Sequence, residues 1–274
     1  MPHRASPACR RARPWLGTMV EIHARAATTM QAEAAVHAAF AEIGQIHRLM
    51  SRHDPDSDVS RFNRAPVGVP VPVDARTLAV LACAAALHAA SDGAFDCERR
   101  PALKEGITGP GVAWQIDGNA VRKHRPVQLD LGGIAKGYAV DRAIAAMLSA
   151  GVENAVVNAG GDLRHAGAMP VAVCLRDPGA PARTALTWTL DNAALASSVA
   201  GGLFPAAGEP SRIAVRRGEP AVPRTAGATI LAADCMLAVA LTKVVLVCRA
   251  PVHPLLAAHG ARTLLYRDGN SANA

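Results

Sequence analysis

The sequence predicts a single α+β domain in which mixed or antiparallel sheets are flanked by helices and a ligand cleft lies between two lobes. Short strand-like runs alternate with longer runs whose apolar residues recur at helical spacing. The 274 residues are 50% hydrophobic, which is enough to build one extended core. Because no repeat, linker or low-complexity segment interrupts the alternation, residues 1–274 are expected to form one domain.

The first part of the chain begins with a predicted strand and a long helix. Residues 17–24 form the strand, and residues 30–50 carry apolar side chains at helical spacing. Residues 54–56, Asp-Pro-Asp, then break the chain as a turn. An alanine-rich, buried helix is predicted over residues 74–90 and ends before Gly93.

Turn signals organise the rest of the chain. An Asp-Gly pair predicts a hairpin between residues 112–116 and residues 120–125. A strand at residues 127–131 leads into a glycine turn, and the helix at residues 138–150 ends at Gly151, which suits a left-handed cap. The later elements are expected to be strands at 155–158, 171–176, 185–190 and 229–232, a loop at 201–227 and a closing helix at 234–247.

Composition and cysteine spacing exclude several classes of protein. The formal net charge of +7 favours anionic ligands, but aromatic residues make up only 3% of the chain. Nucleic-acid surfaces combine basic residues with stacking aromatics, so no nucleic-acid partner is expected. The six cysteines are scattered without a C-x-x-C pair. This pattern argues against a zinc site and a disulfide framework, and it favours a reducing compartment.

The N-terminal segment shows no export signal. Residues 1–14 are basic, polar and broken by prolines, without the apolar core of a secretory signal. No apolar run precedes Cys9, as a lipoprotein signal would require, and no run is long enough to cross a membrane. The chain as given is therefore expected to be cytoplasmic, to have no transmembrane segment, and to be disordered over residues 1–9.

The most informative stretch is residues 129–141, LDLGGIAKGYAVD. A short strand carrying Asp130 meets two adjacent glycines, and a helix bearing Lys136 follows. Such glycines let the backbone approach a ligand and leave amide groups free at a helix start, while a lysine can meet a phosphate as a point charge. The spacing matches neither a P-loop nor a dinucleotide fingerprint. The residues alone leave open a nucleotide or diphosphate site and a structural corner capped by Asp130.

Six blocks of sequence decide between these interpretations. They are RRARPWLGTMVEI at 10–22, MSRHDPDSDVSRFN at 50–63, SDGAFD at 91–96, LDLGGIAKGYAVD at 129–141, VNAGGDLR at 157–164 and ATILAADCMLAVALTKVV at 228–245. The blocks span nearly the whole chain. In this content and order they resemble the ApbE-like family, the FAD:protein FMN transferases.

The resemblance implies an enzyme that divides FAD at its diphosphate. The FMN half passes to the hydroxyl of a threonine or serine in a target flavoprotein, and AMP is released. FAD would be a substrate and Mg²⁺ a cofactor, because a divalent metal neutralises charge on the diphosphate. Many family members are exported, so the periplasmic face of the inner membrane is the alternative location.

The family also implies roles for individual residues. Gly133 matches a position whose carbonyl binds the metal, Asp141 is expected to pin the following helix, and Asp162 is expected to be structural. His53 stands where an aromatic residue is common, so it either keeps a stacking role or is a solvated loop histidine. No catalytic base is identified. The residues implied to contact the flavin nucleotide are Leu16, His53, Ala94, Phe95, Asp96, Asp130 and Lys136.

Two departures from the family pattern fall at functional positions. The last motif usually reads A-D-A-L with a metal-binding aspartate, but here Val239 takes that position. Thr242 remains as a possible oxygen ligand, and the charge of Lys243 is expected near the vacated position. Residues 211–218, SRIAVRRG, keep only the arginine and glycine of the family's H-x-x-D-P-R-T-G loop.

These departures leave three hypotheses open. The first is a working transferase whose Mg²⁺ is held by the Gly133 carbonyl, Thr242 and waters. The second is a flavin-binding relative with hydrolytic or lost transferase activity. The third is a protein-interaction module without a nucleotide, and the intact glycine-turn block argues against it.

Overall fold

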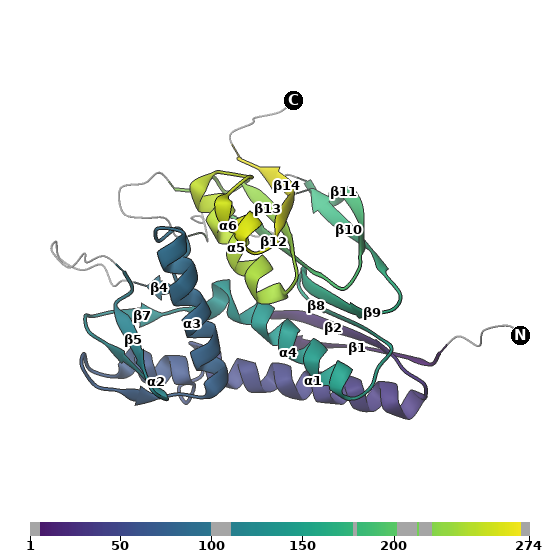
Figure 1. Cartoon of the computed structure of the whole chain (residues 1–274), viewed down its shortest axis with the longest axis horizontal. Coiled ribbons are helices and arrows are strands. Elements are labelled where there is room, and N and C mark those ends of the chain that lie inside the picture. The colour runs from purple at the N-terminus through teal and green to yellow at the C-terminus, as the bar shows by residue number, and fades with distance from the viewer. Residues whose placement is uncertain (1–5, 100–110, 178–179, 202–212, 214–220, 270–274) are drawn as a thin grey trace, which may run out of the picture.

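The computed structural model describes residues 6–99, 111–177, 180–201, 213 and 221–269. A seven-stranded sheet, in which all neighbouring strands are antiparallel, forms its centre (Figure 1). The strands in spatial order are β1 (Ala8–Trp15), β2 (Thr18–Arg25), β8 (Asn154–Ala159), β9 (Asp162–Gly167), β12 (Ala194–Val199), β13 (Gly227–Ala232) and β14 (Arg262–Arg267).

Three helices cover one face of this sheet. Helix α1 (Thr29–Met50) packs on β1 and β2, α4 (Ala135–Ser149) on β8 and β9, and α5 (Cys235–Cys248) on β12 and β13. Helix α4 contacts both of the others, so the helices form a continuous layer (Figure 1). Their buried faces are built largely from alanine, valine, leucine and isoleucine, as the low aromatic content requires.

A hairpin covers part of the opposite face. It consists of β10 (Val171–Asp177) and β11 (Ala180–Leu190). Along β12, Ala194 and Ala196 belong to the main core, whereas Leu195 belongs to a second cluster under the hairpin. Because successive strand residues face opposite sides, the sheet separates two apolar cores of unequal size.

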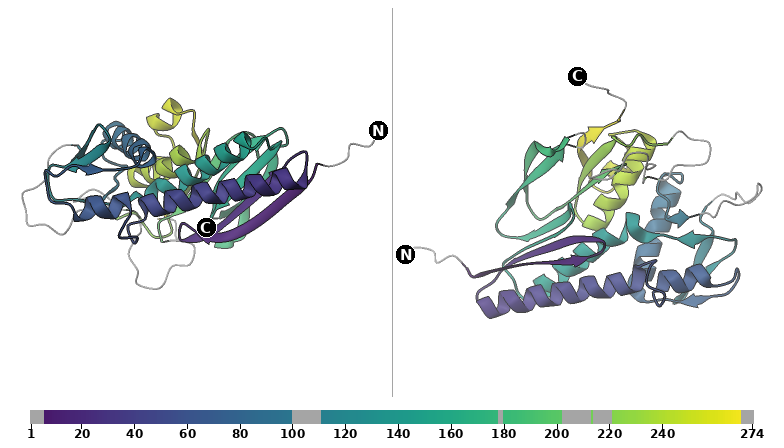
Figure 2. Two further views of the ribbon diagram at one scale, coloured as in Figure 1. Left: turned by 90° about the horizontal axis from the view of Figure 1, so that it is seen from below. Right: turned by 180° about the vertical axis from the view of Figure 1, so that it is seen from behind.

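A smaller lobe lies at one end of the long helix α1 (Figure 2). Its elements are α2 (Asp58–Arg64), α3 (Ala75–Ala90), the three-stranded sheet of β3 (Val71–Pro72), β6 (Ala120–Lys123) and β5 (Trp114–Asp117), and the pair β4 (Glu98–Arg99) and β7 (Gln128–Leu129). The short helices η1 (Leu131–Gly133) and α6 (Pro254–Ala258) complete the described elements. Within the described ranges, no helix has both the length and the apolar composition to cross a membrane.

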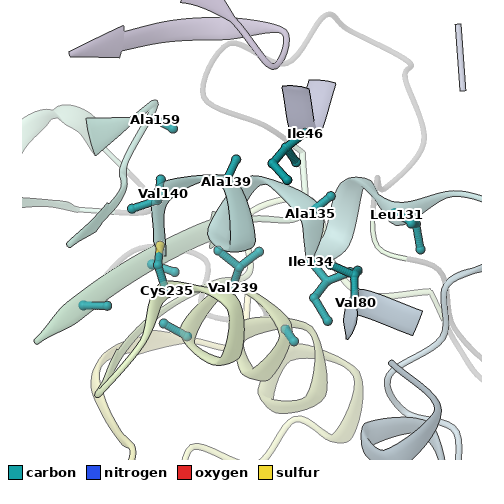
Figure 3. Packing of buried hydrophobic residues seen from close by; sticks show 14 of the residues in the cluster. Ile46, Val80, Leu131, Ile134, Ala135, Ala139, Val140, Ala159, Cys235 and Val239 are labelled. Carbon is teal, nitrogen blue, oxygen red and sulfur yellow. The ribbon is translucent and has the colours of Figure 1, made fainter. Parts of the chain in front are cut away.

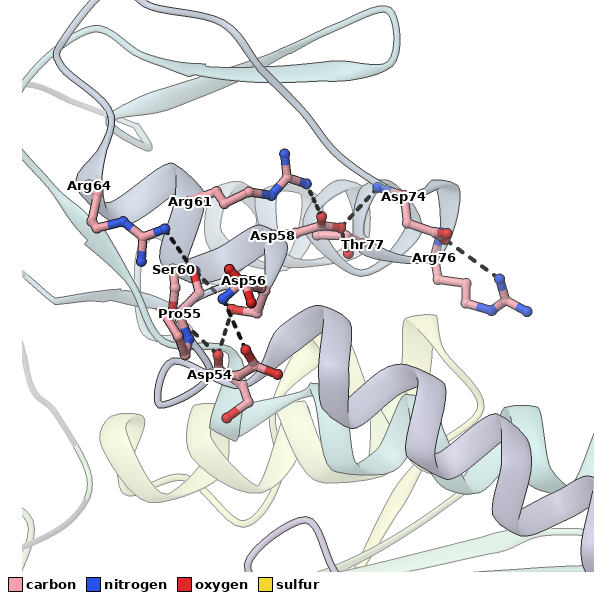
Figure 4. A network of polar contacts seen from close by, with 12 residues as sticks. Asp54, Pro55, Asp56, Asp58, Ser60, Arg61, Arg64, Asp74, Arg76 and Thr77 are labelled. Atoms are coloured by element: carbon pink, nitrogen blue, oxygen red, sulfur yellow. Dashed lines mark hydrogen bonds and ion pairs between the residues drawn. The ribbon is translucent and has the colours of Figure 1, made fainter.

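A buried carboxylate fastens α2 to the start of α3. The side chain of Asp58 is only 3% exposed and forms an ion pair with Arg61. Its Oδ2 also accepts hydrogen bonds from the backbone N of Asp74 (2.9 Å) and from Oγ1 of Thr77 (2.6 Å; Figure 4). A buried charge is tolerated only when it is paired in this way, so Asp58 is a structural anchor of the smaller lobe.

Most of the predicted elements are confirmed, with shifted ends. Helix α4 begins at Ala135 rather than at residue 138, and it ends before Gly151, whose φ of 76° is left-handed as expected. Strand β1 was not predicted. It begins at Ala8, so the prediction that residues 1–9 are disordered is wrong for residues 8 and 9. Its arginines and Pro14 hide the strand pattern, but they suit the edge of a sheet.

Candidate functional site

Two hairpin turns meet at one end of the large sheet. The turn between β1 and β2 is Leu16-Gly17, with φ values of 56° and 73°. The turn between β8 and β9 is Gly160-Gly161, and a Cβ atom on Gly160 would lie only 2.3 Å from Oγ1 of Thr18. The second glycine turn therefore packs directly on the first. A leucine with a positive φ is strained, and strain of this kind concentrates at binding sites.

Asp130 caps the glycine turn that precedes α4. Its Oδ1 accepts a hydrogen bond from the backbone N of Gly132 (3.0 Å), and its Oδ2 lies 3.3 Å from Nε of Arg52. The structural interpretation expected a buried aspartate that caps the helix; Asp130 instead caps the short helix η1, and α4 begins after Ile134 without a side-chain cap. The side chain is still 35% exposed, so the carboxylate is accessible, and its contact with a nucleotide stays a prediction.

Lys136 and Asp162 form an ion pair at the edge of the turn. The Nζ atom of Lys136 lies 2.6 Å from Oδ2 of Asp162. The Asp162 side chain is 3% exposed, whereas that of Lys136 is 33% exposed. Asp162 therefore has a structural role, as expected, and it holds the lysine at the first turn of α4 with part of its ammonium group open to solvent.

Lys243 approaches Gly133 from α5. Its Nζ donates hydrogen bonds to Oγ of Ser198 (2.8 Å) and to Oγ1 of Thr242 (3.1 Å). A Cβ atom placed on Gly133 would lie 3.9 Å from Cε of this lysine. The ammonium group thus projects from α5 toward the same turn that Lys136 borders.

Charged neighbours surround the Lys243 ammonium group. Burial, together with the positive charge of Lys136, lowers its pKa to about 8. The carboxylate of Asp162 and the thiol of Cys235 act in the opposite direction. The group is therefore a cation near neutral pH. Burial destabilises its charged form, and any anion that binds beside it would stabilise that form.

The residues around Gly133 do not fit Mg²⁺. Val239 is fully buried and faces α4 near Ala139 (Figure 3). The Thr242 hydroxyl is also buried; it donates to the carbonyl of Val239 (2.7 Å) and lies 2.7 Å from Oγ of Ser198. Mg²⁺ requires a near-octahedral set of oxygen ligands, usually including a carboxylate. No cluster of three His, Cys, Asp or Glu side chains that could hold a metal occurs in the described parts of the chain.

The expected role of Thr242 as a metal ligand is therefore not supported. Its hydroxyl already engages three partners, and one of them is the Lys243 ammonium group. A metal ion on this oxygen would have to displace those contacts and would approach a positive charge.

The segment carrying Ala94, Phe95 and Asp96 lies beneath the glycine turn. Ala94 and Phe95 are buried, and a Cβ atom on Gly133 would lie 3.9 Å from Cε2 of the Phe95 ring. The Phe95 carbonyl is 3.1 Å from Nδ1 of His88, and Asp96 is partly exposed. Phe95 thus supports the turn from within the core. A backbone contact between this segment and the nucleotide remains a prediction.

His53 lies at a pocket in the smaller lobe, beside Asp130 rather than in a cleft between lobes. The pocket has a volume of about 310 Å³, and none of the described side chains that line it is acidic. Its lining residues are Arg52, His53, Pro55, Ser60, Asn63, Arg64, Arg99, Gln128 and Leu129. Arg52 also pairs with Asp130, and Leu129 lines the pocket, so the pocket adjoins the start of the glycine turn. Three arginines make it suited to an anionic group.

Asp141 holds α5 in place, as its expected role requires. Its Oδ1 accepts hydrogen bonds from the backbone N of Cys235 (2.9 Å) and from Arg164 (2.7 Å). Its Oδ2 accepts one from the backbone N of Met236 (2.8 Å). These contacts fix the N-terminal end of the helix that carries Lys243, and a carboxylate there complements the helix dipole.

The predicted site residues fall into two neighbouring groups. Gly133, Lys136 and the Leu16 turn border one end of the large sheet, while His53 and Asp130 are connected through Arg52. Two residues of the site were not predicted. Ser198 lies on a strand that was not predicted, and nothing in the sequence pointed to Arg52 except its place beside His53. Residues 211–218, where a nucleotide-covering loop was sought, lie outside the described residues except for 213.

Known proteins resemble this chain in both sequence and fold. An FAD:protein FMN transferase of Vibrio cholerae is 29% identical over 167 residues, which cover 51% of this chain and 50% of that protein. The ApbE protein of Thermotoga maritima is 26% identical, with a TM-score of 0.73 over 89% of this chain and 88% of that structure. The apo flavinyl transferase ApbE of Pseudomonas stutzeri is 22% identical, with a TM-score of 0.72 over 90% of this chain and 88% of that structure.

These matches are extensive enough to assign the family but not the activity. The chain spans about half the length of the Vibrio protein, so that protein's activity is not transferred directly. The ApbE family model matches residues 16–261, which include the Leu16 turn, the glycine turn and α5. Since this match covers most of the chain and the fold agrees with it, the chain belongs to the ApbE family.

Proposed function

We propose that this protein transfers the FMN moiety of FAD to a threonine or serine hydroxyl of a target protein and releases AMP. The acceptor oxygen forms a bond to the phosphorus of the FMN phosphate. The bond from that phosphorus to the bridging oxygen of the diphosphate breaks, and AMP leaves with that oxygen. The hydroxyl proton passes to solvent or a base, and no residue is assigned to that step.

The convergence of positive groups on the glycine turn carries this proposal. Lys136 follows Gly133 by three residues at the start of α4, and Lys243 approaches Gly133 from α5; both are held by hydrogen bonds or an ion pair. A diphosphate is the part of FAD that such a pair of ammonium groups would bind, because each can act as a point charge on a phosphate. The family's named relatives act on FAD, which agrees with this chemistry.

The arginine pocket supports binding of one end of the dinucleotide. His53 offers a flat ring at its edge, and Arg52, Arg64 and Arg99 supply positive charge. An aromatic ring system of FAD can stack on an imidazole or a guanidinium plane. With the diphosphate at the glycine turn, one ring system would reach this pocket past Asp130.

Flavin transfer to a protein acceptor tests the proposal. Purified protein is incubated with FAD and a threonine-bearing acceptor protein, and flavin fluorescence is read after denaturing electrophoresis. The expected result is flavin that stays on the acceptor, with one AMP released for each flavin attached. An acceptor in which the threonine is replaced by alanine is the control. Absence of both FAD binding and attached flavin would contradict the proposal.

Hydrolysis of FAD is the second candidate, and the lack of a fitting metal-ligand set among the described residues around Gly133 favours keeping it. Water would then attack the FMN phosphorus in place of the acceptor hydroxyl, and the products would be FMN and AMP. The same reaction mixture separates the two functions, because hydrolysis releases AMP with free FMN and leaves the acceptor unlabelled.

A further inference from the structure

A cation already lies where the family resemblance placed a metal ion. We propose that the ammonium group of Lys243 replaces the divalent metal, so that this protein neutralises the diphosphate of FAD without a metal ion between Gly133 and α5. This inference rests on the proposed function, because it describes how the same site handles its substrate.

Val239 and Lys243 lie on the same face of α5. They are four residues apart, and residues at that spacing are neighbours one turn apart. Val239 stands where the family resemblance implies a metal-binding aspartate, and Lys243 places a positive nitrogen one turn later. The site therefore lacks that cation-binding group but contains a cation of its own.

The hydrogen bonds of Lys243 leave it a donor for a substrate. An ammonium group carries three N–H donors. Two of them are directed to the hydroxyls of Ser198 and Thr242, at 2.8 and 3.1 Å. These contacts hold the group in a defined position beside Gly133 and leave the third N–H without an acceptor among the described hydrogen bonds of this residue.

The charge balance around Gly133 disfavours a divalent metal. Lys136 and Lys243 contribute two positive charges, and Asp162 contributes one negative charge that is already paired with Lys136 at 2.6 Å. Asp130 adds a second negative charge on the same turn, and it lies 3.3 Å from Nε of Arg52. A divalent ion entering this space would therefore meet two ammonium groups, and among the described residues it would find these two carboxylates already paired with cations. A diphosphate is negatively charged, so both ammonium groups would stabilise it in this space.

Metal binding to the unmodified protein provides the first test. Mg²⁺ is titrated into the full-length protein by calorimetry, with and without bound FAD, and FAD affinity is measured by fluorescence quenching in EDTA and in Mg²⁺. We expect no saturable Mg²⁺ binding in the millimolar range and the same FAD affinity in both buffers. Saturable Mg²⁺ binding together with FAD binding that requires Mg²⁺ would overturn the inference.

The variant Lys243→Met provides the second test. Methionine keeps most of the side-chain length and removes the charge. We expect FAD affinity to fall about 10- to 100-fold, as for the loss of a charge-assisted contact, with no recovery on adding Mg²⁺. An unchanged affinity would overturn the inference. If the variant does not fold, as judged by circular dichroism, the calorimetry of the unmodified protein decides.

The outcomes also separate this inference from the proposed function. If the unmodified protein transfers flavin only when Mg²⁺ is present and binds that ion saturably, the function stands and the role of Lys243 is wrong. If it binds no FAD in either buffer, the proposed function itself fails.

Discussion

Removing the Asp141 side chain should loosen α5 and disturb the site that depends on it. The carboxylate accepts hydrogen bonds from the backbone N–H groups of Cys235 and Met236 and from Arg164. An unpaired buried donor costs about 1–3 kcal/mol. The Arg164 side chain is 29% exposed, so water can replace part of its contact. Burial raises the pKa of Asp141, which means that its charge is itself costly and offsets some of the gain.

These terms predict that Asp141→Ala lowers the free energy of unfolding by about 3–5 kcal/mol. Urea denaturation at neutral pH measures the loss. Asp234→Ala is the matched control: Asp234 also caps α5, but it accepts a single hydrogen bond, from the N of Leu237 at 2.8 Å, and its loss should cost about 1 kcal/mol.

FAD affinity gives an independent measurement on the same variant. Because Asp141 fixes the end of the helix that carries Lys243, Asp141→Ala should also weaken FAD binding under conditions where the protein is folded. A loss of less than 1 kcal/mol in stability, together with unchanged FAD affinity, would refute the reasoning that Asp141 positions α5.

Three further predictions concern packing, anchoring and pH. Gly137→Ala would place a Cβ atom 2.3 Å from the carbonyl oxygen of Cys235 in α5, so it should lower the free energy of unfolding, measured by heat or urea, by about 3 kcal/mol. Gly133→Ala is the control: its Cβ atom meets only ordinary contacts at 3.9 Å, so this variant should fold normally. Asp58→Ala should cost about 2–4 kcal/mol by urea unfolding, while Asp56→Ala on the exposed loop should change stability by less than about 0.5 kcal/mol. Because the pKa of Lys243 is lowered to about 8, FAD affinity measured by fluorescence should fall as the pH rises through that value, by up to about tenfold per pH unit, and a Lys243→Met variant should lack this dependence.

The sequence was most informative where one element carries its own pattern. Helix α1 has apolar residues at helical spacing, and the hairpin of β5 and β6 has an Asp-Gly turn, so both were predicted close to their observed ends. The glycine turn was also predicted as a strand, turn and helix, although Asp130 caps the turn itself and not the helix that follows. In these segments the local pattern and the tertiary environment favour the same structure.

The missed strands depend on the neighbouring strands of the sheet with which they pair. Strand β1 is rich in arginine and becomes a strand because it pairs with β2 at the edge of the sheet. Strand β12 is short and pairs with β9 and β13, and no local signal distinguishes it from a loop. Ser198 lies on that strand, so its contact with Lys243 across 45 residues of sequence could not be predicted from spacing.

The position of Val239 shows why the loss of a motif residue is best interpreted together with the residues around it. Taken alone, Val239 indicates a damaged site, because valine cannot bind a cation. In the structure, however, Val239 fills core space against α4, and the residue one helical turn later already presents an ammonium group to the glycine turn. An aspartate at position 239 would lie beside that ammonium group and would pair with it before it could bind a metal. Restoring the carboxylate alone would therefore cancel the cation that the site now has. Val239 and Lys243 are thus better understood together, as a position without a metal ligand beside a cation that the chain itself supplies.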